Sequence, residues 1–291
     1  MGLGLVVLNY NDYETTINFI NNIKSYKNID KIVIVDNNSS NESVEKIKSV
    51  IDNRIELIES QENAGYGSGN NIGIKYLEKF DEIKYIGISN PDINFKESDI
   101  DDLLGLFERN DRISLLSGRI VENNRFASDG AWRLPTYKEC LLQCIPLIDK
   151  IINKNLSYDE SHYNGEYSIV DIIKGCFFIV KKDVFKDISG FDEKTFLYYE
   201  ENIIGKKMKE KGYLIATLNC IDIYHMHGET INKSIDKLNR FHILGESRRV
   251  YVRDYLNVNK YGIVLYNNFN SIGLFIRKLI YILSDLVNKK W

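Results

Sequence analysis

The sequence predicts an α/β protein with a mostly parallel central sheet flanked by helices. Along the first third of the chain, short apolar runs that suit strands buried on both faces alternate with amphipathic helical segments. This βαβαβαβ order is typical of a parallel sheet, because each helix carries the chain back across the sheet. The chain has 291 residues, of which 44% are hydrophobic. We therefore expect a sizeable core in one large domain, or in a domain with a small appendage.

Each expected element rests on its own pattern. The strands are continuous apolar runs, and the helices repeat their apolar residues every three or four positions. Residues 123–168 show neither pattern and stay unassigned. The chain is expected to be helical and basic from residue 233 onward. Strands are expected at 3–8, 31–35, 55–59, 84–88, 113–118 and within 169–180, and helices at 12–26, around 44–51, through 74–77, at 100–107 and at 200–211.

Composition bears on the partners and on the location of the protein. The formal net charge of −3 gives no sign of wholesale nucleic-acid binding. The first strand follows no basic leader, and no apolar run reaches the roughly 18 residues that a membrane-spanning helix needs. These observations predict a cytoplasmic protein.

Polar residues follow each of the first four expected strands. In open α/β sheets the carboxyl ends of the strands border one crevice where ligands bind, so we expect these residues to converge there. Asp36 is placed to accept a hydrogen bond from a base or a ribose, and Asp92 offers a carboxylate to Mg²⁺ or Mn²⁺. Ordinary turn residues are the alternative for each cluster alone. The clusters are Asn9-Tyr10-Asn11, Asp36-Asn37-Asn38, the glycine-rich stretch 63–73 and Asn90-Pro91-Asp92.

Two further groups lie downstream. Glu200 and Glu201 open an expected helix, where acidic residues also occur simply because they favour the helix dipole. His225 and His227 are two residues apart at the end of an apolar segment. On a strand they would face the same side and reach one site, although a structural role is the alternative.

Read in order, these clusters resemble the GT-A-fold glycosyltransferases of family 2, especially their bacterial rhamnosyltransferase-like branch. The resemblance covers roughly residues 3 to 255, and its ordered set of motifs is more specific than any one member. The motifs are Val6-Val7-Leu8-Asn9-Tyr10-Asn11, Val35-Asp36-Asn37-Asn38-Ser39-Ser40, the stretch 63–73, Asn90-Pro91-Asp92, Gly175-Cys176-Phe177, Gly190-Phe191-Asp192-Glu193, Tyr199-Glu200-Glu201 and His225-x-x-Gly228.

The resemblance implies a divalent cation, Mn²⁺ or Mg²⁺, and a role for each matching residue. Asp92 would ligate the cation together with His225, with His227 as the alternative, and Asn90 would be a weak ligand where the family has Asp. Glu201 stands where many members have the catalytic base as Asp, with Glu200 as the alternative. The nucleotide would be bound by Asn9, Tyr10, Asp36, Asn63, Gly65 and Asn70, and phosphate or acceptor contacts would come from Gly175, Arg248, Arg249 and Arg253.

The resemblance also implies a division of the chain. Residues 1–232 would form the catalytic domain, with a nucleotide-binding half over about 1–98 and an acceptor and catalytic half over about 99–232. Residues 233–291 would form a helical C-terminal extension. Its last segment mixes bulky apolar residues with Lys and Arg, which suits a peripheral contact with the inner face of the plasma membrane or a homodimer contact.

The activity implied is inverting transfer of a sugar from a nucleotide diphosphate to a hydroxyl of a bacterial surface polysaccharide, such as O-antigen or capsule, on a lipid-linked acceptor. The first expectation for the donor is dTDP-rhamnose, followed by a UDP-hexose. One alternative is a sugar-nucleotide pyrophosphorylase, which would need a glycine-rich basic loop directly after the first strand, where this chain has Asn9-Tyr10-Asn11-Asp12. The other is a non-catalytic partner subunit that binds nucleotide sugars.

Overall fold

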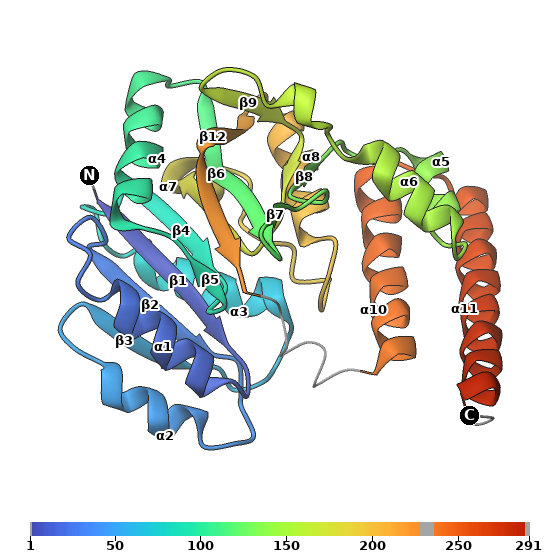
Figure 1. Ribbon diagram of the computed structural model, residues 1–291, viewed down its shortest axis with the longest axis horizontal. Coiled ribbons are helices and arrows are strands. Elements are labelled where there is room, and N and C mark those ends of the chain that lie inside the picture. The colour runs from blue at the N-terminus through green and yellow to red at the C-terminus, as the bar shows by residue number, and fades with distance from the viewer. Residues whose placement is uncertain (1, 227–235, 289–291) are drawn as a thin grey trace.

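The computed structural model describes residues 2–226 and 236–288 of the chain (Figure 1). The strands of the main sheet are β1 (Leu3–Asn9), β2 (Lys31–Asp36), β3 (Ile55–Glu59), β4 (Tyr85–Ser89), β5 (Ile93–Asn94), β6 (Ile113–Glu122), β7 (Arg125–Phe126), β9 (Tyr167–Val170), β11 (Phe177–Lys181) and β12 (Leu214–His225). A second, two-stranded sheet pairs β8 (Ala131–Trp132) with β10 (Ile172–Ile173).

The helices are α1 (Tyr13–Ile23), α2 (Ser43–Ile47), α3 (Tyr66–Leu77), α4 (Glu97–Arg109), α5 (Tyr137–Leu142), α6 (Ile148–Leu156), α7 (Lys182–Asp187), α8 (Glu200–Glu210), α10 (Lys237–Val250) and α11 (Lys260–Asn288). Short 3₁₀ turns follow α2 and precede β9, and a π-helical turn, Tyr251–Tyr255, ends α10.

The main sheet has two halves of different character. Its strand order is β3-β2-β1-β4-β11-β6-β12-β5, with β7 beside β6 and β9 beside β12. The first four strands are parallel, as predicted. In the second half β11 runs antiparallel to both β4 and β6, whereas β6 and β12 are parallel. The predicted mostly parallel arrangement therefore holds for the first half, while the second is mixed.

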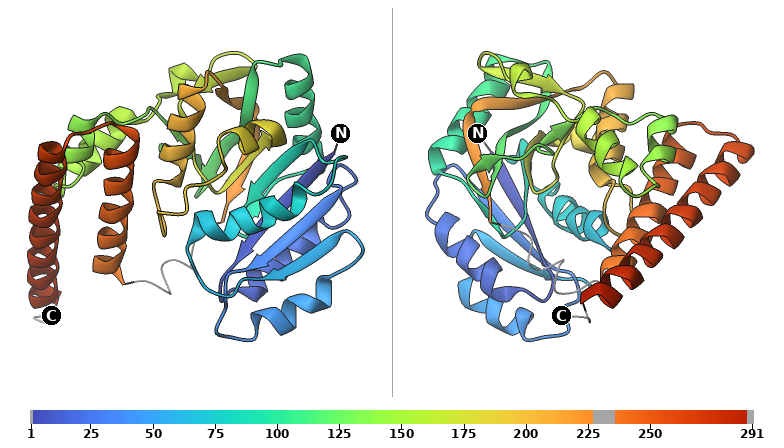
Figure 2. Two further views of the ribbon diagram at one scale, coloured as in Figure 1. Left: turned by 180° about the vertical axis from the view of Figure 1, so that it is seen from behind. Right: turned by 45° about the vertical axis from the view of Figure 1, so that its right-hand side comes forward.

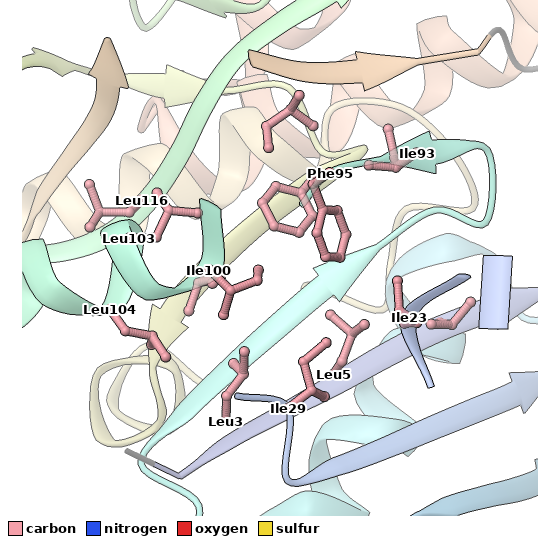
Figure 3. Close-up of a cluster of buried hydrophobic side chains, with 14 of the residues drawn as sticks. Leu3, Leu5, Ile23, Ile29, Ile93, Phe95, Ile100, Leu103, Leu104 and Leu116 are labelled. Carbon is pink, nitrogen blue, oxygen red and sulfur yellow. The ribbon is translucent and has the colours of Figure 1, made fainter. Parts of the chain in front are cut away.

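Hydrophobic side chains cover both faces of this sheet. On one face α4 buries Ile100, Leu103 and Leu104 (Figure 3). Phe107 is buried on the same side of the helix, as its spacing requires. Full burial of side chains of this size stabilises the fold by about 1.5–3 kcal/mol each. The other face packs against α3, α7 and α8. The strand ends that carry the polar clusters are thus held by a rigid, covered sheet.

The C-terminal helices α10 and α11 lie side by side at the edge of the molecule, beyond α8 (Figures 1 and 2). A third hydrophobic cluster joins them to α5 and α8 through Tyr199, Ile203, Tyr251 and Tyr266. The expected helical extension is therefore present. Its proposed boundary after residue 232 falls outside the described residues.

Candidate active site

A cavity of about 480 Å³ opens at the carboxyl ends of β1, β2 and β4, a volume typical of small-molecule sites. One side of the cavity, here called the sheet wall, comes from the strand ends and the glycine-rich stretch. The opposite side, here called the helix wall, comes from the segment before α8 and from α10. The sheet wall consists of Leu8, Tyr10, Asp12, Asn37, Asn63, Gly65, Tyr66, Asn90, Pro91 and Asp92, and the helix wall of Phe196, Leu197, Asp236, Asn239, His242 and Ile243.

The predicted nucleotide residues Asn9 and Asp36 lie behind the sheet wall rather than on it. Each is 1% exposed. The Asn9 amide and the Ser39 hydroxyl both donate to Asp36 Oδ2 at 2.7 Å, and the Ser39 N–H donates to Oδ1 at 2.8 Å. The Asp36 carboxylate is thus bonded within the protein, and the cavity surface at this strand end is formed by Asn37.

Asn37 belongs to a cluster predicted to border the crevice, but the binding role at this strand end was predicted for Asp36. The Asn37 amide nitrogen donates to Asn63 Oδ1 at 2.9 Å. Its Oδ1 is buried and has no hydrogen-bond partner among the described residues. A buried acceptor without a partner suits a ligand donor, since leaving it unpaired is costly. The one sequence signal for this role is its place directly after the β2 strand.

The glycine-rich stretch brings the two walls together at Gly65, which has φ 101°. A Cβ at this position would lie 2.2 Å from the carbonyl oxygen of Phe196. The N–H of the next residue, Tyr66, donates to that same carbonyl at 2.8 Å. Gly65 therefore serves a close backbone approach. The predicted nucleotide residue Asn70 is buried in α3 and donates to the Tyr66 carbonyl, away from the cavity surface.

Three neighbouring strands bring Asp92, His225 and Glu122 together. His225 Nε2 lies 3.3 Å from Asp92 Oδ2, and its Nδ1 lies 2.7 Å from Glu122 Oε1. Burial lowers the pKa of His225, but its hydrogen bonds with Asp92 and Glu122 outweigh that effect and raise the pKa to about 9. The hydrogen bond from His225, opposed by burial and assisted by Lys174, lowers the pKa of Glu122 to about 2.

Asp92 and His225 fit a hard divalent cation. Asp92 Oδ1 is buried without a hydrogen-bond partner in the described part of the chain, and carboxylate oxygen and imidazole nitrogen both ligate Mn²⁺. Asn90 Oδ1 lies 3.1 Å from the Tyr66 hydroxyl and is thus already in contact. Residues 2–226 and 236–288 contain no cluster of three or more His, Cys, Asp and Glu side chains placed for a metal. The alternative ligand His227 lies outside those ranges.

The acidic pair at the start of α8 is asymmetric. Glu201 Oε1 accepts from the Gly175 N–H at 3.1 Å, whereas Glu200 is 3% exposed and its Oε1 has no hydrogen-bond partner among the described residues. Burial raises the pKa of both groups, and the charge of Glu201 raises the pKa of Glu200 further. Two adjacent buried carboxyls cannot both ionise cheaply, and the hydrogen bond from the Gly175 N–H favours the charged form at Glu201.

The structure does not bring Arg248, Arg249 or Arg253 to the cavity. Arg248 is 5% exposed, and its Nε donates to the Tyr199 hydroxyl at 3.1 Å. Arg249 lies 3.5 Å from Glu246, and Arg253 lies 2.6 Å from Asp254. None of the three borders the cavity, which corrects the expectation that they contact phosphates there. For Arg248 the reason is helix phase, and Arg249 and Arg253 are paired with Glu246 and Asp254.

The face of α10 toward the cavity carries Asn239 and His242 instead. Arg248 comes nine residues after Asn239, which is two and a half helical turns and so the opposite side of the helix. Neither Asn239 nor His242 was predicted from the sequence. Their three-residue spacing is the signal that would have placed them on one face.

Comparisons with known proteins give one family match. The sequence pattern of the glycosyl transferase family 2 matches residues 5–189 of the chain. The low-salt glycan biosynthesis hexosyltransferase Agl10 of Haloferax volcanii is 26% identical over 225 residues, which are 77% of this chain and 66% of that protein. The N-acetylglucosaminyl-diphospho-decaprenol L-rhamnosyltransferase of Mycobacterium tuberculosis is 21% identical over 59% of this chain and 58% of its own length. The chain therefore spans less than two thirds of each relative.

Solved structures show a similar fold. The mannosyltransferase PcManGT of Pyrobaculum calidifontis, in complex with GDP-Man and Mn²⁺, has a TM-score of 0.58 at 12% identity and covers 98% of this chain and 79% of its own. GalNAc-T7, with UDP, GalNAc and Mn²⁺, has a TM-score of 0.61 at 14% identity, over 98% of this chain and 57% of its own. These likenesses confirm the predicted fold.

Proposed function

The chain belongs to glycosyl transferase family 2 and has the GT-A fold, and from this premise we propose that it is a metal-dependent, inverting glycosyltransferase. The observation that carries the proposal is the cavity of about 480 Å³ at the carboxyl ends of β1, β2 and β4, with Asp92 on its sheet wall. A nucleotide diphosphate sugar is the ligand class that this arrangement fits.

The sheet wall is proposed to bind the nucleotide. Tyr10, Asn37 and Asn63 face the cavity there, and Asn37 supplies a buried acceptor without a protein partner among the described residues. Asp36 and Asn9 support this wall from behind by fixing the strand ends. A direct contact between Asp36 and the nucleobase would require Asp36 to give up its hydrogen bonds with Ser39 and Asn9 and to form bonds with the ligand in their place.

Asp92 and His225 are proposed to hold the cation. A divalent cation there would supply positive charge to the diphosphate leaving group. Asp92 borders the cavity, so its carboxylate is within reach of phosphates bound in it.

Glu201 is proposed as the base. Glu201 lies at the start of α8, and its carboxylate accepts a hydrogen bond from the Gly175 N–H. Burial raises its pKa toward the range in which a base works best. It would take the proton of the acceptor hydroxyl as that oxygen bonds to the anomeric carbon. The bond from this carbon to the phosphate oxygen breaks, the nucleoside diphosphate leaves, and the configuration inverts in one displacement.

The names of the relatives support a donor and an acceptor class. The mycobacterial relative is named as a rhamnosyltransferase of a diphospho-decaprenol acceptor, and the archaeal relative as a hexosyltransferase. We therefore propose dTDP-rhamnose as the first donor to test and a UDP-hexose as the second. The proposed acceptor is a lipid-linked precursor of a bacterial surface polysaccharide, such as O-antigen or capsule.

The outer face of α11 is proposed to lie on an anionic membrane surface. Most of its exposed apolar residues lie three, four or seven positions apart and so share one face, whereas Tyr266 and Arg277 pack on the protein side. No described helix is long and apolar enough to cross a membrane. Lys278, on the same helix, is exposed and complements anionic headgroups. The residues on this face are Tyr261, Val264, Leu265, Ile272, Phe275, Leu279, Ile282 and Leu283, and Ile280 is exposed beside it.

Vesicle co-sedimentation tests this surface. Phe275→Glu with Leu283→Glu should abolish binding to vesicles that contain phosphatidylglycerol, because both side chains are more than 60% exposed and contribute to the apolar face. Ile51→Glu, at an exposed apolar position in another part of the molecule, is the control. If vesicle binding is unchanged, the face does not contact the membrane. If vesicle binding is unchanged but the protein no longer forms dimers, the face is a homodimer contact.

Calorimetric titration with dTDP, UDP and GDP, with and without Mn²⁺ or Mg²⁺, tests the main proposal. We expect one diphosphate to bind in a metal-dependent manner, and Asp92→Ala to remove that dependence. Absence of binding by the folded chain in the presence of metal would contradict the proposal.

Two alternatives have their own outcomes. A pyrophosphorylase would form a nucleotide sugar from a nucleoside triphosphate and a sugar phosphate. A non-catalytic partner subunit would bind the donor, and Glu201→Ala would leave its function intact.

A further inference from the structure

Glu122 lies at the end of β6, beside the end of β12 that carries His225. Residues 122 and 225 are 103 positions apart in sequence, and the parallel pairing of the two strands brings them together. Asp92 comes from the other neighbour, because β5 pairs with β12 next to it. The N–H of Met226 donates to the Asp92 carbonyl at 2.8 Å and ties the two segments at this point.

One contact of Glu122 fixes the imidazole of His225. Glu122 Oε1 lies 2.7 Å from Nδ1, so Nδ1 carries a proton and donates it. The other nitrogen, Nε2, then faces Asp92. A carboxylate behind a histidine in this way selects both the ring orientation and the nitrogen that is offered to a metal.

The second contact of Glu122 reaches toward the proposed base. The same Oε1 accepts from Lys174 Nζ at 2.7 Å, and Lys174 also bonds Asp129 at 3.0 Å. Lys174 directly precedes Gly175, whose N–H donates to Glu201. Glu122 and Lys174 are each about 80% buried at the side chain, so this ion pair is well shielded from solvent.

We propose that Glu122 is a positioning residue for the cation site: it orients His225 toward Asp92, and through Lys174 it steadies the turn that holds Glu201. The inference rests on the proposed function, since it concerns the same site. Glu122, like His225 and Glu201, lies outside the set of residues that border the cavity. Its role is proposed to run through its contacts with His225 and Lys174, without a contact to substrate.

An ordinary stabilising ion pair would look the same in the geometry, so the test must separate the two roles. If Glu122 has only a structural role, its removal should weaken the binding of all ligands to the same extent, or should weaken none. If Glu122 positions His225, its removal should weaken only the metal-dependent part of ligand binding. The affinity for a nucleoside diphosphate in EDTA and the affinity in Mn²⁺ report on these two parts separately.

The experiment uses the full chain and its Glu122→Ala, Glu122→Gln and Glu122→Asp variants. Binding of Mn²⁺ alone is followed by the electron paramagnetic resonance signal of the free ion, and binding of dTDP and UDP by calorimetry. We expect Glu122→Ala to weaken Mn²⁺ binding by about 10- to 100-fold, with the affinity for diphosphate in EDTA unchanged. Glu122→Asp should recover part of the loss, because it restores the carboxylate.

Glu166→Ala is the matched control. Glu166 also forms an ion pair, with Arg109 at 2.6 Å, but that pair is more than half exposed and far along the chain from the cavity residues. It should leave Mn²⁺ binding unchanged. Glu122→Gln keeps the size of the side chain and answers the question if the alanine variant does not fold.

The outcomes separate the two proposals. A folded Glu122 variant that binds Mn²⁺ as tightly as the unaltered chain, or that loses EDTA and Mn²⁺ affinities equally, overturns the positioning role alone. An unaltered chain that binds neither Mn²⁺ nor either diphosphate contradicts the proposed function, and the positioning role with it.

Discussion

The two walls of the cavity are built in different ways. At the sheet wall the strand ends are fixed by the covered sheet, and directly behind it the polar groups of Asn9, Asp36 and Ser39 bond one another before any ligand arrives. On the helix wall the polar groups of Asn239 and His242 stand on one face of α10, and His242 is exposed. The sheet wall is thus preorganised for the nucleotide proposed to bind there, whereas side chains on the helix wall can vary without disturbing the sheet.

The largest expected effect is on the catalytic rate, and it should leave nucleotide binding unchanged. Glu201→Gln should lower kcat by about 10²- to 10⁴-fold, because the amide cannot accept the proton of the acceptor hydroxyl. Binding of the nucleoside diphosphate on the sheet wall should stay unchanged. Steady-state rates and calorimetry on the same preparation check both statements.

Glu200→Gln is the matched control and has its own signature in stability. Glu200 has a raised pKa in the folded chain, so above about pH 4.5, its ordinary pKa, the unfolded chain releases a proton that the folded chain keeps. Stability then falls as pH rises toward the folded pKa. The Gln variant should retain activity and show a flatter fall in Tm between pH 5 and pH 8. Loss of activity equal to that of Glu201→Gln would assign the base to Glu200.

The next effect, on stability, concerns Gly65, where the two walls approach each other closely. Gly65→Ala places a methyl group against the Phe196 carbonyl at a positive φ and should destabilise the fold by about 2–4 kcal/mol. Gly212→Ala is the control, since Gly212 has φ 78° with no atom within 4 Å of the added carbon; it should cost about 1 kcal/mol. Thermal unfolding of both variants measures the difference. Equal losses would mean that the close approach of the two walls does not matter for stability.

The smallest effect concerns the helix wall. His242→Ala should raise KM for the nucleotide sugar by roughly 2- to 10-fold, the value of one hydrogen bond, and leave the affinity for the bare nucleoside diphosphate unchanged. His162→Ala, at a histidine bonded to the Ile169 carbonyl and outside the cavity lining, is the control. Equal losses of affinity for the sugar nucleotide and the diphosphate would place the nucleotide on both walls.

The sequence predicted the first half of the fold well because β1, β2 and β4 are apolar runs that are almost entirely buried, and β3 is a short apolar segment at the sheet edge. Expected strands at 31–35 and 55–59 correspond to β2 and β3 within one residue. Residues 123–168 gave no pattern because their elements are short: β7 and β8 have two residues each and α5 has six. Such elements are held by tertiary contacts rather than by periodicity.

The candidate site was predicted where one strand end carries its own signal, as at Asp92. It was not predicted where strand pairing or helix phase decides the outcome. Glu122 meets His225 only through the pairing of β6 with β12. Arg248 turns away from the cavity because of its position around α10, a property that a basic composition does not reveal.

The construction of the helix wall has a consequence for engineering the protein. The cavity face of α10 consists of a few side chains from one helix, and the hydrophobic cluster that anchors α10 lies on its other side. A library restricted to Asn239, His242 and Ile243 would therefore sample new sugar preferences while the nucleotide half and the anchor of the helix stay intact. Substrate range in this chain is then a modular trait, open to redesign at three neighbouring positions.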